Sequence, residues 1–294
     1  MATRSEPPER PRPAGRPTLA ALAFDEAAAA RLRRGRGTVH ALREQMRTIG
    51  ALLMREALTR YGNSRIGYLW AIIEPAVFIG LFLALRGYLK ETVPIGENLA
   101  LFLMSGIVTA RVAISIQSKI GGAISSNRAL LVYPLVNPLD TVAARCVLEC
   151  LTGMVVIVLF FVGLMVVDEG ATIVNFAVFS QALVVMLLLT CAMGAFNAVV
   201  STISPAYGRV WGLLSFPLFI TSGAFFVPAT LPEGLLRIVW WNPILHIVEW
   251  AREGIYLDYL SVGEPAYPIL LSVGLICGAL AVERVFRLRV VSEQ

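Results

Sequence analysis

Six long apolar stretches follow one another between Ile66 and Val285, and each is long enough to cross a lipid bilayer. A helix needs about 20 mostly apolar residues to span a hydrocarbon core of roughly 30 Å. The predicted spans are Ile66–Leu85, Leu99–Ile120, Val142–Val167, Ile173–Ile203, Val210–Val227 and Tyr267–Val285. The pattern predicts an all-α integral membrane protein with six transmembrane helices, and it leaves little room for a separate water-soluble domain.

The chain holds only two lysines, Lys90 and Lys119, and neither follows a glycine-rich loop of the GxxxxGK[ST] kind that cradles nucleotide phosphates. Charged residues make up 15% of the sequence, against about 25% in a typical soluble domain. We therefore expect no enzymatic activity and no bound cofactor in this chain. Energy for any driven transport is expected to come from a partner.

The basic residues indicate how the chain is oriented in the membrane. An even number of spans puts both termini on one side, and most of the arginines fall on that same side, including all of those before Ile66. Loops that stay in the cytoplasm carry an excess of Lys and Arg. Both termini of this multi-pass protein are therefore predicted to be cytoplasmic.

Two different segments precede the first span. Residues 1–37 are rich in Pro, Ala and Arg, which predicts a disordered basic tail that either stays solvated or touches anionic lipid headgroups. From Thr38 to Gly62, apolar residues recur at spacings of three and four. This period predicts an amphipathic helix that lies in the inner membrane surface, with packing on a partner as the alternative.

Four of the charged residues in or beside the predicted spans carry the most information. Glu74 and Arg111 are the deepest, and a charge at mid-membrane normally faces protein or water and has a partner. Arg111 is therefore predicted either to line a polar pathway or to form a structural ion pair. Arg145 and Glu149 stand four residues apart at the start of the third span, where they are expected to pair on one helix face.

The connection between the fifth and sixth spans is too polar to cross the membrane and too apolar for an ordinary loop. Proline positions favour two short helices, Glu233–Trp241 and Pro243–Tyr256, of a length typical of re-entrant or interfacial segments. Its tryptophans and tyrosines suit the membrane–water interface. An alternative is that some of these rings face a conduit.

Histidine and cysteine patterns favour no catalytic or metal site. The two histidines, His40 and His246, do not form a cluster with the four cysteines, which lie in or near apolar spans without a CxxC spacing. We expect the cysteines to be packing residues and expect no metal site.

Five segments in this order resemble the permease subunit of bacterial ABC exporters of capsular and other cell-surface polysaccharides. They are RYGNSRIGYLW at Arg60–Trp70 with Glu74-Pro75, then Arg111, then Asn127–Glu149, then the proline- and aromatic-rich fifth span, and NPILHIVEWAREGIY at Asn242–Tyr256. The motif residues are Arg60, Tyr61, Trp70, Glu74, Pro75, Arg145, Glu149, Asn242, Pro243, His246, Glu249 and Arg252. The resemblance assigns residues 38–290 to one transmembrane domain.

The resemblance also implies partners. Two copies of the permease would pair with two separate ATPase subunits, which bind the ATP and Mg²⁺. The coupling contact is expected at Asn127, Arg128, Leu131 and Tyr133. Membrane lipids and periplasmic export proteins are further expected partners, and nucleic acid is not.

The implied cargo is a lipid-linked polysaccharide, with capsule, O-antigen and other glycans left open. Its path is predicted to involve Arg111, Phe219, Phe225 and Trp250. Two other functions stay open at this point. One is export of a lipid or drug by a permease of the same fold. The other is secondary transport, for which we find no internal repeat.

Overall fold

The computed structural model describes residues 38–61, 66–89, 93–128, 137–168 and 170–292. Within them the regular structure is helical: α2 (Thr38–Tyr61), α3 (Ile66–Leu89), α4 (Leu99–Gly121), α5 (Ala123–Ser126), α6 (Pro138–Val167), α7 (Phe176–Ile203), α8 (Pro205–Ile220), the 3-10 helix η2 (Pro228–Thr230), α9 (Glu233–Val239), α10 (Pro243–Ile255) and α11 (Ala266–Ser292). The contacts below all lie within Thr48–Gln294, a compact unit distinct from Met1–Arg47. The predicted tail, residues 1–37, lies outside the described residues.

Four of the long or buried helices begin at an asparagine. The side-chain oxygens of Asn98, Asn175 and Asn242 each accept a hydrogen bond from a backbone N–H in the first turn of α4, α7 and α10. Asn137 and Asp140 form a reciprocal capping box at the start of α6. These side chains satisfy N–H groups that a helix leaves unpaired, so they fix where each helix begins.

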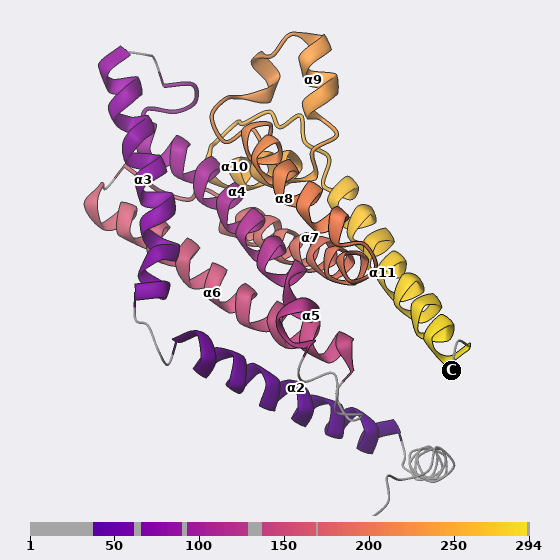
Figure 1. Cartoon of the computed structure of the whole chain (residues 1–294). Coiled ribbons are helices and arrows are strands. Elements are labelled where there is room, and N and C mark those ends of the chain that lie inside the picture. Colours follow the sequence, from indigo (N-terminus) through magenta and orange to yellow (C-terminus); the bar gives the residue numbers. More distant parts are fainter. Residues whose placement is uncertain (1–37, 62–65, 90–92, 129–136, 169, 293–294) are drawn as a thin grey trace, which may run out of the picture. The chain divides into compact units, whose positions relative to one another are not determined.

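Helix α4 is the centre of the bundle. In its apolar stretch 78% of the residues are buried, against 56% in α7, 28% in α6, 17% in α11 and 11% in α3. Figure 1 shows α9 and α10 near the end of the bundle where α4 begins, and α5 where α4 ends. The bundle therefore has two distinct ends joined by one buried helix.

Glycines allow close helix contacts around this core. A Cβ at Gly194 of α7 would lie 2.5 Å from the Cβ of Ile120, and one at Gly254 of α10 would lie 2.5 Å from the backbone nitrogen of Phe179. Small residues serve this purpose in membrane helix packing, where close backbone approach replaces the hydrophobic effect.

Five helices of the described residues are long and apolar enough to cross a membrane: α3 (from Ile72), α4, α6, α7 and α11 (to Val285). The predicted span Val210–Val227 is wrong in its bounds, because α8 runs from Pro205 to Ile220 and the chain then turns. Its 16 residues are about 24 Å long at 1.5 Å per residue. The fourth span begins at Phe176 instead of Ile173, while the two short helices before the last span are confirmed.

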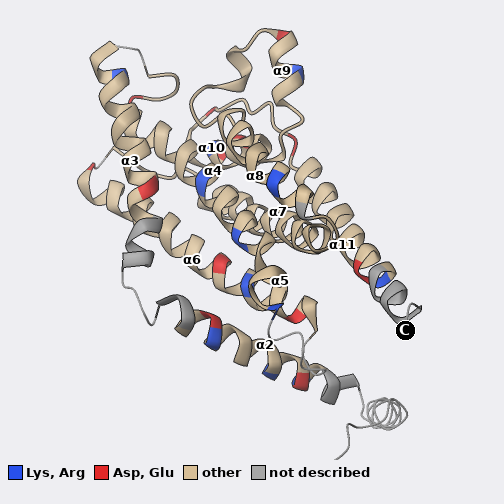
Figure 2. Ribbon diagram, viewed as in Figure 1, with Lys and Arg blue, Asp and Glu red and all other residues tan. Residues whose placement is uncertain are grey.

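Charges are distributed unevenly over these helices. Figure 2 shows Lys, Arg, Asp and Glu gathered on α2 and around α5, while the long helices are mostly uncharged. Large apolar side chains on the outer faces stay exposed in the single chain, among them Leu81, Val158, Leu213 and Leu270. Exposed apolar faces on long helices are typical of chains surrounded by lipid or by another membrane subunit.

Candidate functional site

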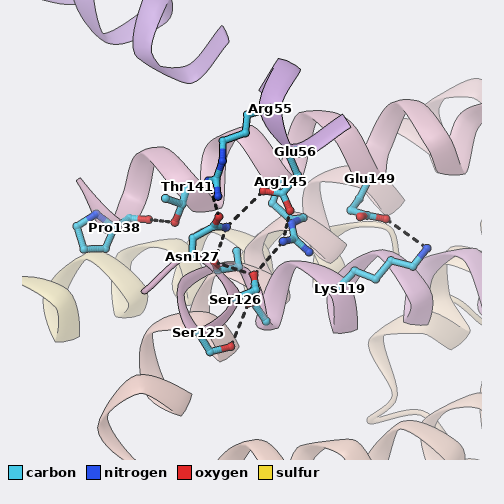
Figure 3. Close-up of polar contacts among 12 residues, drawn as sticks. Arg55, Glu56, Lys119, Ser125, Ser126, Asn127, Pro138, Thr141, Arg145 and Glu149 are labelled. Atoms are coloured by element: carbon cyan, nitrogen blue, oxygen red, sulfur yellow. Dashed lines mark hydrogen bonds and ion pairs between the residues drawn. The ribbon is translucent and has the colours of Figure 1, made fainter. Parts of the chain in front are cut away.

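Asn127 occupies the corner between α5 and α6, and its side chain points toward α2 (Figure 3). Its amide nitrogen donates to Glu56 Oε2 at 3.3 Å and to the carbonyl of Ala123 at 3.0 Å. Its amide oxygen accepts a hydrogen bond from Arg55 Nη1 at 3.3 Å. Since α5 ends one residue earlier, Asn127 both closes this short helix and attaches it to α2.

Arg145 reaches the same corner from α6. Its guanidinium forms an ion pair with Glu56, and its Nη2 donates to Ser126 Oγ at 2.9 Å. The side chains of Arg145 and Glu56 are only 8% and 12% exposed. A buried pair of this kind persists only when further hydrogen bonds satisfy it, and here Ser126 and Asn127 supply them.

A second ion pair lies one helical turn after Arg145 on α6 (Figure 3). Lys119 Nζ of α4 is 3.3 Å from Glu149 Oε2, and the Glu149 side chain is 1% exposed. The predicted contact between Arg145 and Glu149 stays a prediction. Both side chains have partners on other helices, so this face of α6 connects α2 with α4.

The coupling residues predicted from the resemblance fall into three groups. Asn127 is buried and faces α2, which makes it a residue that shapes the corner. Arg128 is exposed next to it. Leu131 and Tyr133 lie outside the described residues. The side chains of Arg60, Tyr61 and Trp70 also lie outside the description.

Arg111 has a partner that the sequence did not reveal. Its guanidinium forms an ion pair with Glu74 of α3 and lies 4.9 Å from the ring centre of Phe78 and 5.1 Å from that of Phe219. The ion pair that was one of the two alternatives for Arg111 is therefore present, and its role in a pathway stays a prediction. The two predicted intramembrane charges neutralise each other between α3 and α4, and two aromatic faces stabilise the cation.

A cavity of about 140 Å³ adjoins this pair between α3, α4 and α6. Its polar lining comes from two ion pairs and two hydroxyls: Glu74, Arg111, Ser115, Lys119, Glu149 and Thr152. Pro75 also lines it, at the point where α3 continues through a proline. Arg111 and its partner keep 22% and 37% of their side chains exposed, so this charge site is open to a small polar group.

The three aromatic residues predicted for a pathway lie in different surroundings. Phe219 is fully buried and packs edge-on against Phe78 and Phe225, at centroid distances of 5.6 and 5.2 Å. Phe225 is partly buried against the core. Trp250 lies on α10 and is partly buried. The structure thus brings Arg111 and Phe219 together, and Phe225 packs edge-on against Phe219.

A third polar cluster fixes α10 and the turns around it. The Asn242 amide donates to the carbonyl of Leu218 at 2.7 Å, and Pro243 supplies the first residue of the helix. His246 Nε2 lies 2.8 Å from the Trp240 carbonyl, and its Nδ1 accepts from the Glu264 backbone N–H at 2.9 Å. These partners require a neutral ring with the proton on Nε2. Burial lowers the pKa of His246, which favours that form.

Glu249 and Arg252 complete this cluster. Both side chains are fully buried, with Arg252 Nη1 3.8 Å from Glu249 Oε1. The carboxylate also accepts from Tyr259 Oη at 2.5 Å and from the Val262 N–H at 3.2 Å. The guanidinium donates to the carbonyls of Phe226 and Ala224 at 3.1 and 3.4 Å. These contacts therefore hold the irregular backbone that follows α8 in place.

Sequence reasoning missed Glu56, Lys119 and Phe102, whose ring lies 4.3 Å below the Arg252 guanidinium. A signal existed for Glu56, because Arg55-Glu56 puts two charges next to the apolar face of the predicted amphipathic helix. In the described part of the chain no group of three or more His, Cys, Asp or Glu residues could hold a metal ion.

The fold and these sites define a class: a helical membrane protein with charged pairs inside the bundle and a polar corner at one end. The sequence profile of the ABC-2 type transporter family matches residues 47–256. The chain therefore belongs to the ABC-2 type transporter family, whose members are membrane subunits of transporters.

Several relatives cover most of the chain. The polysialic acid transport protein KpsM of Escherichia coli is 32% identical over 216 residues, which make up 74% of this chain and 84% of KpsM. The capsule polysaccharide export inner-membrane protein BexB of Haemophilus influenzae is 31% identical over 223 residues, with the same coverage. CtrC of Neisseria meningitidis serogroup A, a protein of the same description, is 30% identical over 239 residues, or 81% of this chain and 90% of CtrC.

Proposed function

We propose that this chain is the transmembrane subunit of an ATP-driven exporter that moves a lipid-linked cell-surface polysaccharide, such as capsule or O-antigen, across the bacterial inner membrane. The observation that carries the proposal is the similarity to KpsM, BexB and CtrC along 74–81% of the chain. The match to the family profile over residues 47–256 includes the charged sites on α3, α4 and α6.

The energy is proposed to come from a separate cytoplasmic ATPase that binds ATP and Mg²⁺. The sequence supports this, because neither lysine belongs to a phosphate-binding loop. The segment from Ser125 to Asp140 is the proposed docking contact, with Asn127, Arg128, Leu131 and Tyr133 nearest the ATPase. Arg128 is exposed within it, and the buried Asn127 holds it against α2.

The proposed topology has six spans with both termini in the cytoplasm. It counts α8 as the fifth span, with α9 and α10 as re-entrant or interfacial helices at the outer end. Two features support this arrangement. The basic residues concentrate before the first span. The backbone carbonyls that follow α8 are also satisfied by arginines, as irregular backbone inside a membrane requires.

The transport path is proposed to form between two copies of the chain. A single copy leaves large apolar faces on its long helices exposed, which supports a second membrane subunit. Arg111 is the proposed contact for an anionic group of the cargo, because it stays partly exposed beside a polar cavity. Phe225 and Trp250 are proposed to line the outer half, with Phe219 exposed only when the helices separate.

Co-purification tests the proposal. The tagged chain, isolated from its own host in mild detergent, is expected to bring down an ATPase subunit, and ATP hydrolysis is expected only in that complex. A cysteine at Arg128 in a background without the native cysteines should crosslink to this subunit. Hydrolysis by the lone chain that survives replacement of Lys90 and Lys119 contradicts the scheme. So do crosslinks from the region 228–264 alone.

The cargo is tested separately. Loss of the chain should leave polysaccharide inside the cell and remove it from the surface. If surface polysaccharide is unchanged while a lipid or a drug accumulates in the cell, the chain is an exporter of that other class with the same fold.

A further inference from the structure

Three polar contacts among four side chains, together with one peptide bond of the chain, form a closed ring at the inner corner of the bundle (Figure 3). Glu56 pairs with Arg145, Arg145 donates to Ser126, and the chain passes from Ser126 to Asn127, which donates back to Glu56. We call this set, Glu56, Ser126, Asn127 and Arg145, the corner ring. It attaches α2 to the α5–α6 corner at two points at once, which opposes rotation of one element against the other.

The corner ring connects two parts of the chain to which we assign roles in transport. On one side, Ser126 and Asn127 belong to the proposed docking segment. On the other side, α2 leads through residues 62–65 into α3, which carries Glu74. Glu74 in turn pairs with Arg111 of α4 beside the cavity. The corner ring therefore stands between the proposed ATPase contact and the helix that holds the intramembrane ion pair.

The contacts of the corner ring also depend on one another. Its two charged side chains are about nine-tenths buried, and both oxygens of Glu56 are used, one by Arg145 and one by Asn127. A buried ion pair adds little to stability compared with apolar residues of similar size, yet it fixes one geometry, since any displacement leaves a buried charge uncompensated. Such a contact transmits a displacement instead of absorbing it.

We propose that Glu56 is a positioning residue for energy coupling: through the corner ring it makes α2 move with the α5–α6 corner when the ATPase acts on the docking segment. This rests on the proposed function, because it needs an ATPase at that segment. It predicts that α2 is part of the moving machinery of export and is more than a passive anchor in the membrane surface.

The test removes each charge of the pair in turn and then exchanges the two charges. The variants are Glu56→Gln, Arg145→Gln and the double exchange Glu56→Arg with Arg145→Glu, each measured in the full complex of permease and ATPase from its own host. Both neighbours of the pair can accept the exchange, because the Ser126 hydroxyl donates as well as accepts and the Asn127 amide can rotate. The matched control is the same exchange at Glu233 and Arg237, an ion pair that is almost fully exposed.

The readout is polysaccharide delivered to the cell surface per ATP hydrolysed, per assembled complex. We expect this ratio to fall on the order of tenfold in both single variants, the size typical of a coupling contact. We expect the double exchange to recover most of it and the control exchange to leave it unchanged. A merely structural brace changes the amount of complex in the membrane and leaves the ratio alone.

Three results overturn the proposal. The first is a wild-type ratio in both single variants. The second is a loss of export fully explained by less assembled complex. The third is a double exchange as defective as the single variants. If no ATPase co-purifies with the unaltered chain, the proposed function itself fails. If the unaltered chain assembles with the ATPase and exports polysaccharide, any of these three results rejects only the role of Glu56.

Discussion

Two arginines of this bundle sit against aromatic rings and carboxylates, yet their surroundings differ. Arg252 is fully buried and contacts Glu249, the ring of Phe102 and two backbone carbonyls. Arg111 pairs with Glu74 over two rings, but part of its side chain remains exposed beside a cavity. The first arginine is enclosed on all sides by protein, and the second has an open side.

The difference matches the two roles that we assign: Arg252 holds the fold, and Arg111 is the proposed contact for the cargo. A guanidinium offers five N–H donors, and those of Arg252 are directed at fixed partners on the chain segment after α8 and at Ser105 of α4. It can take no cargo without unfolding that segment. Arg111 can exchange or share its partner with a small anionic group that enters the cavity. Both are arginines at low hydration, so burial alone does not identify a transport residue.

The largest effect is expected from Arg252→Ala. The change leaves the Glu249 carboxylate buried without its cation and the carbonyl of Phe226 without this donor. Removing one partner of a buried pair costs about 3–5 kcal/mol, so little folded protein should reach the membrane. Membrane content and the thermal midpoint in detergent measure this. A midpoint equal to that of the unaltered chain would show that Arg252 is no more necessary for the fold than Arg111.

Arg111→Ala is expected to affect export while the folded protein persists. Glu74 is left beside a cavity, where water can reach it, so the thermal midpoint should change by less than about 4 °C. Surface polysaccharide should fall strongly, and Arg111→Lys should restore little, since an ammonium lacks the planar fork. Normal export by Arg111→Ala, or its absence from the membrane, would place Arg111 with Arg252 as a structural residue.

His246 extends the comparison to pH. It lies outside the five candidate spans, and burial puts its folded pKa below the ordinary value of about 6.5. Below about pH 6.5 the unfolded chain therefore takes up a proton that the folded chain does not, and stability declines as the pH falls. A proton on Nδ1 would also face the Glu264 N–H. The thermal midpoint should fall from pH 8 to about pH 5.5.

His246→Gln provides the control for this decline. Glutamine has no titrating group, so the midpoint of the variant should lie lower at pH 8 and vary less with pH. Arg111→Ala serves as a second comparison, because its thermal midpoint should depend on pH as strongly as that of the unaltered chain. An equal decline in the His246→Gln variant would assign the pH dependence to other groups.

Much of the fold followed from hydropathy and local signals. The spans around α3, α4, α6, α7 and α11 are long apolar runs, and α9 and α10 begin at or next to prolines. The end of α8 did not follow, because the chain turns at only three residues, Thr221-Ser222-Gly223, and is apolar again from Ala224 to Val227; φ of Gly223 is +76°. What permits that turn is distant in sequence: Arg86 and Arg252 donate to the carbonyls of Phe225 and Phe226.

The site was less accessible from the sequence for the same reason. Arg111 and Glu74 were each recognised as unusual, but their pairing depends on how α3 packs against α4. Glu56 and Arg145 stand in helices separated by three others, and no period in the sequence connects them. Residue type and depth predict that a charge needs a partner, and only the packing of the helices decides which one it has.

The smallest effect is expected at a third arginine, Arg237, which completes the comparison. It pairs with Glu233 four residues earlier on α9 at 2.6 Å, and the two side chains are 77% and 78% exposed. Water solvates both charges, so Arg237→Ala should cost only about 0.3–0.5 kcal/mol and leave export unchanged. Thermal midpoint and surface polysaccharide check this in parallel with Arg111→Ala and Arg252→Ala. A loss of export at unchanged stability would give the exposed helix α9 a contact with cargo or partner, and an open side would then no longer distinguish Arg111.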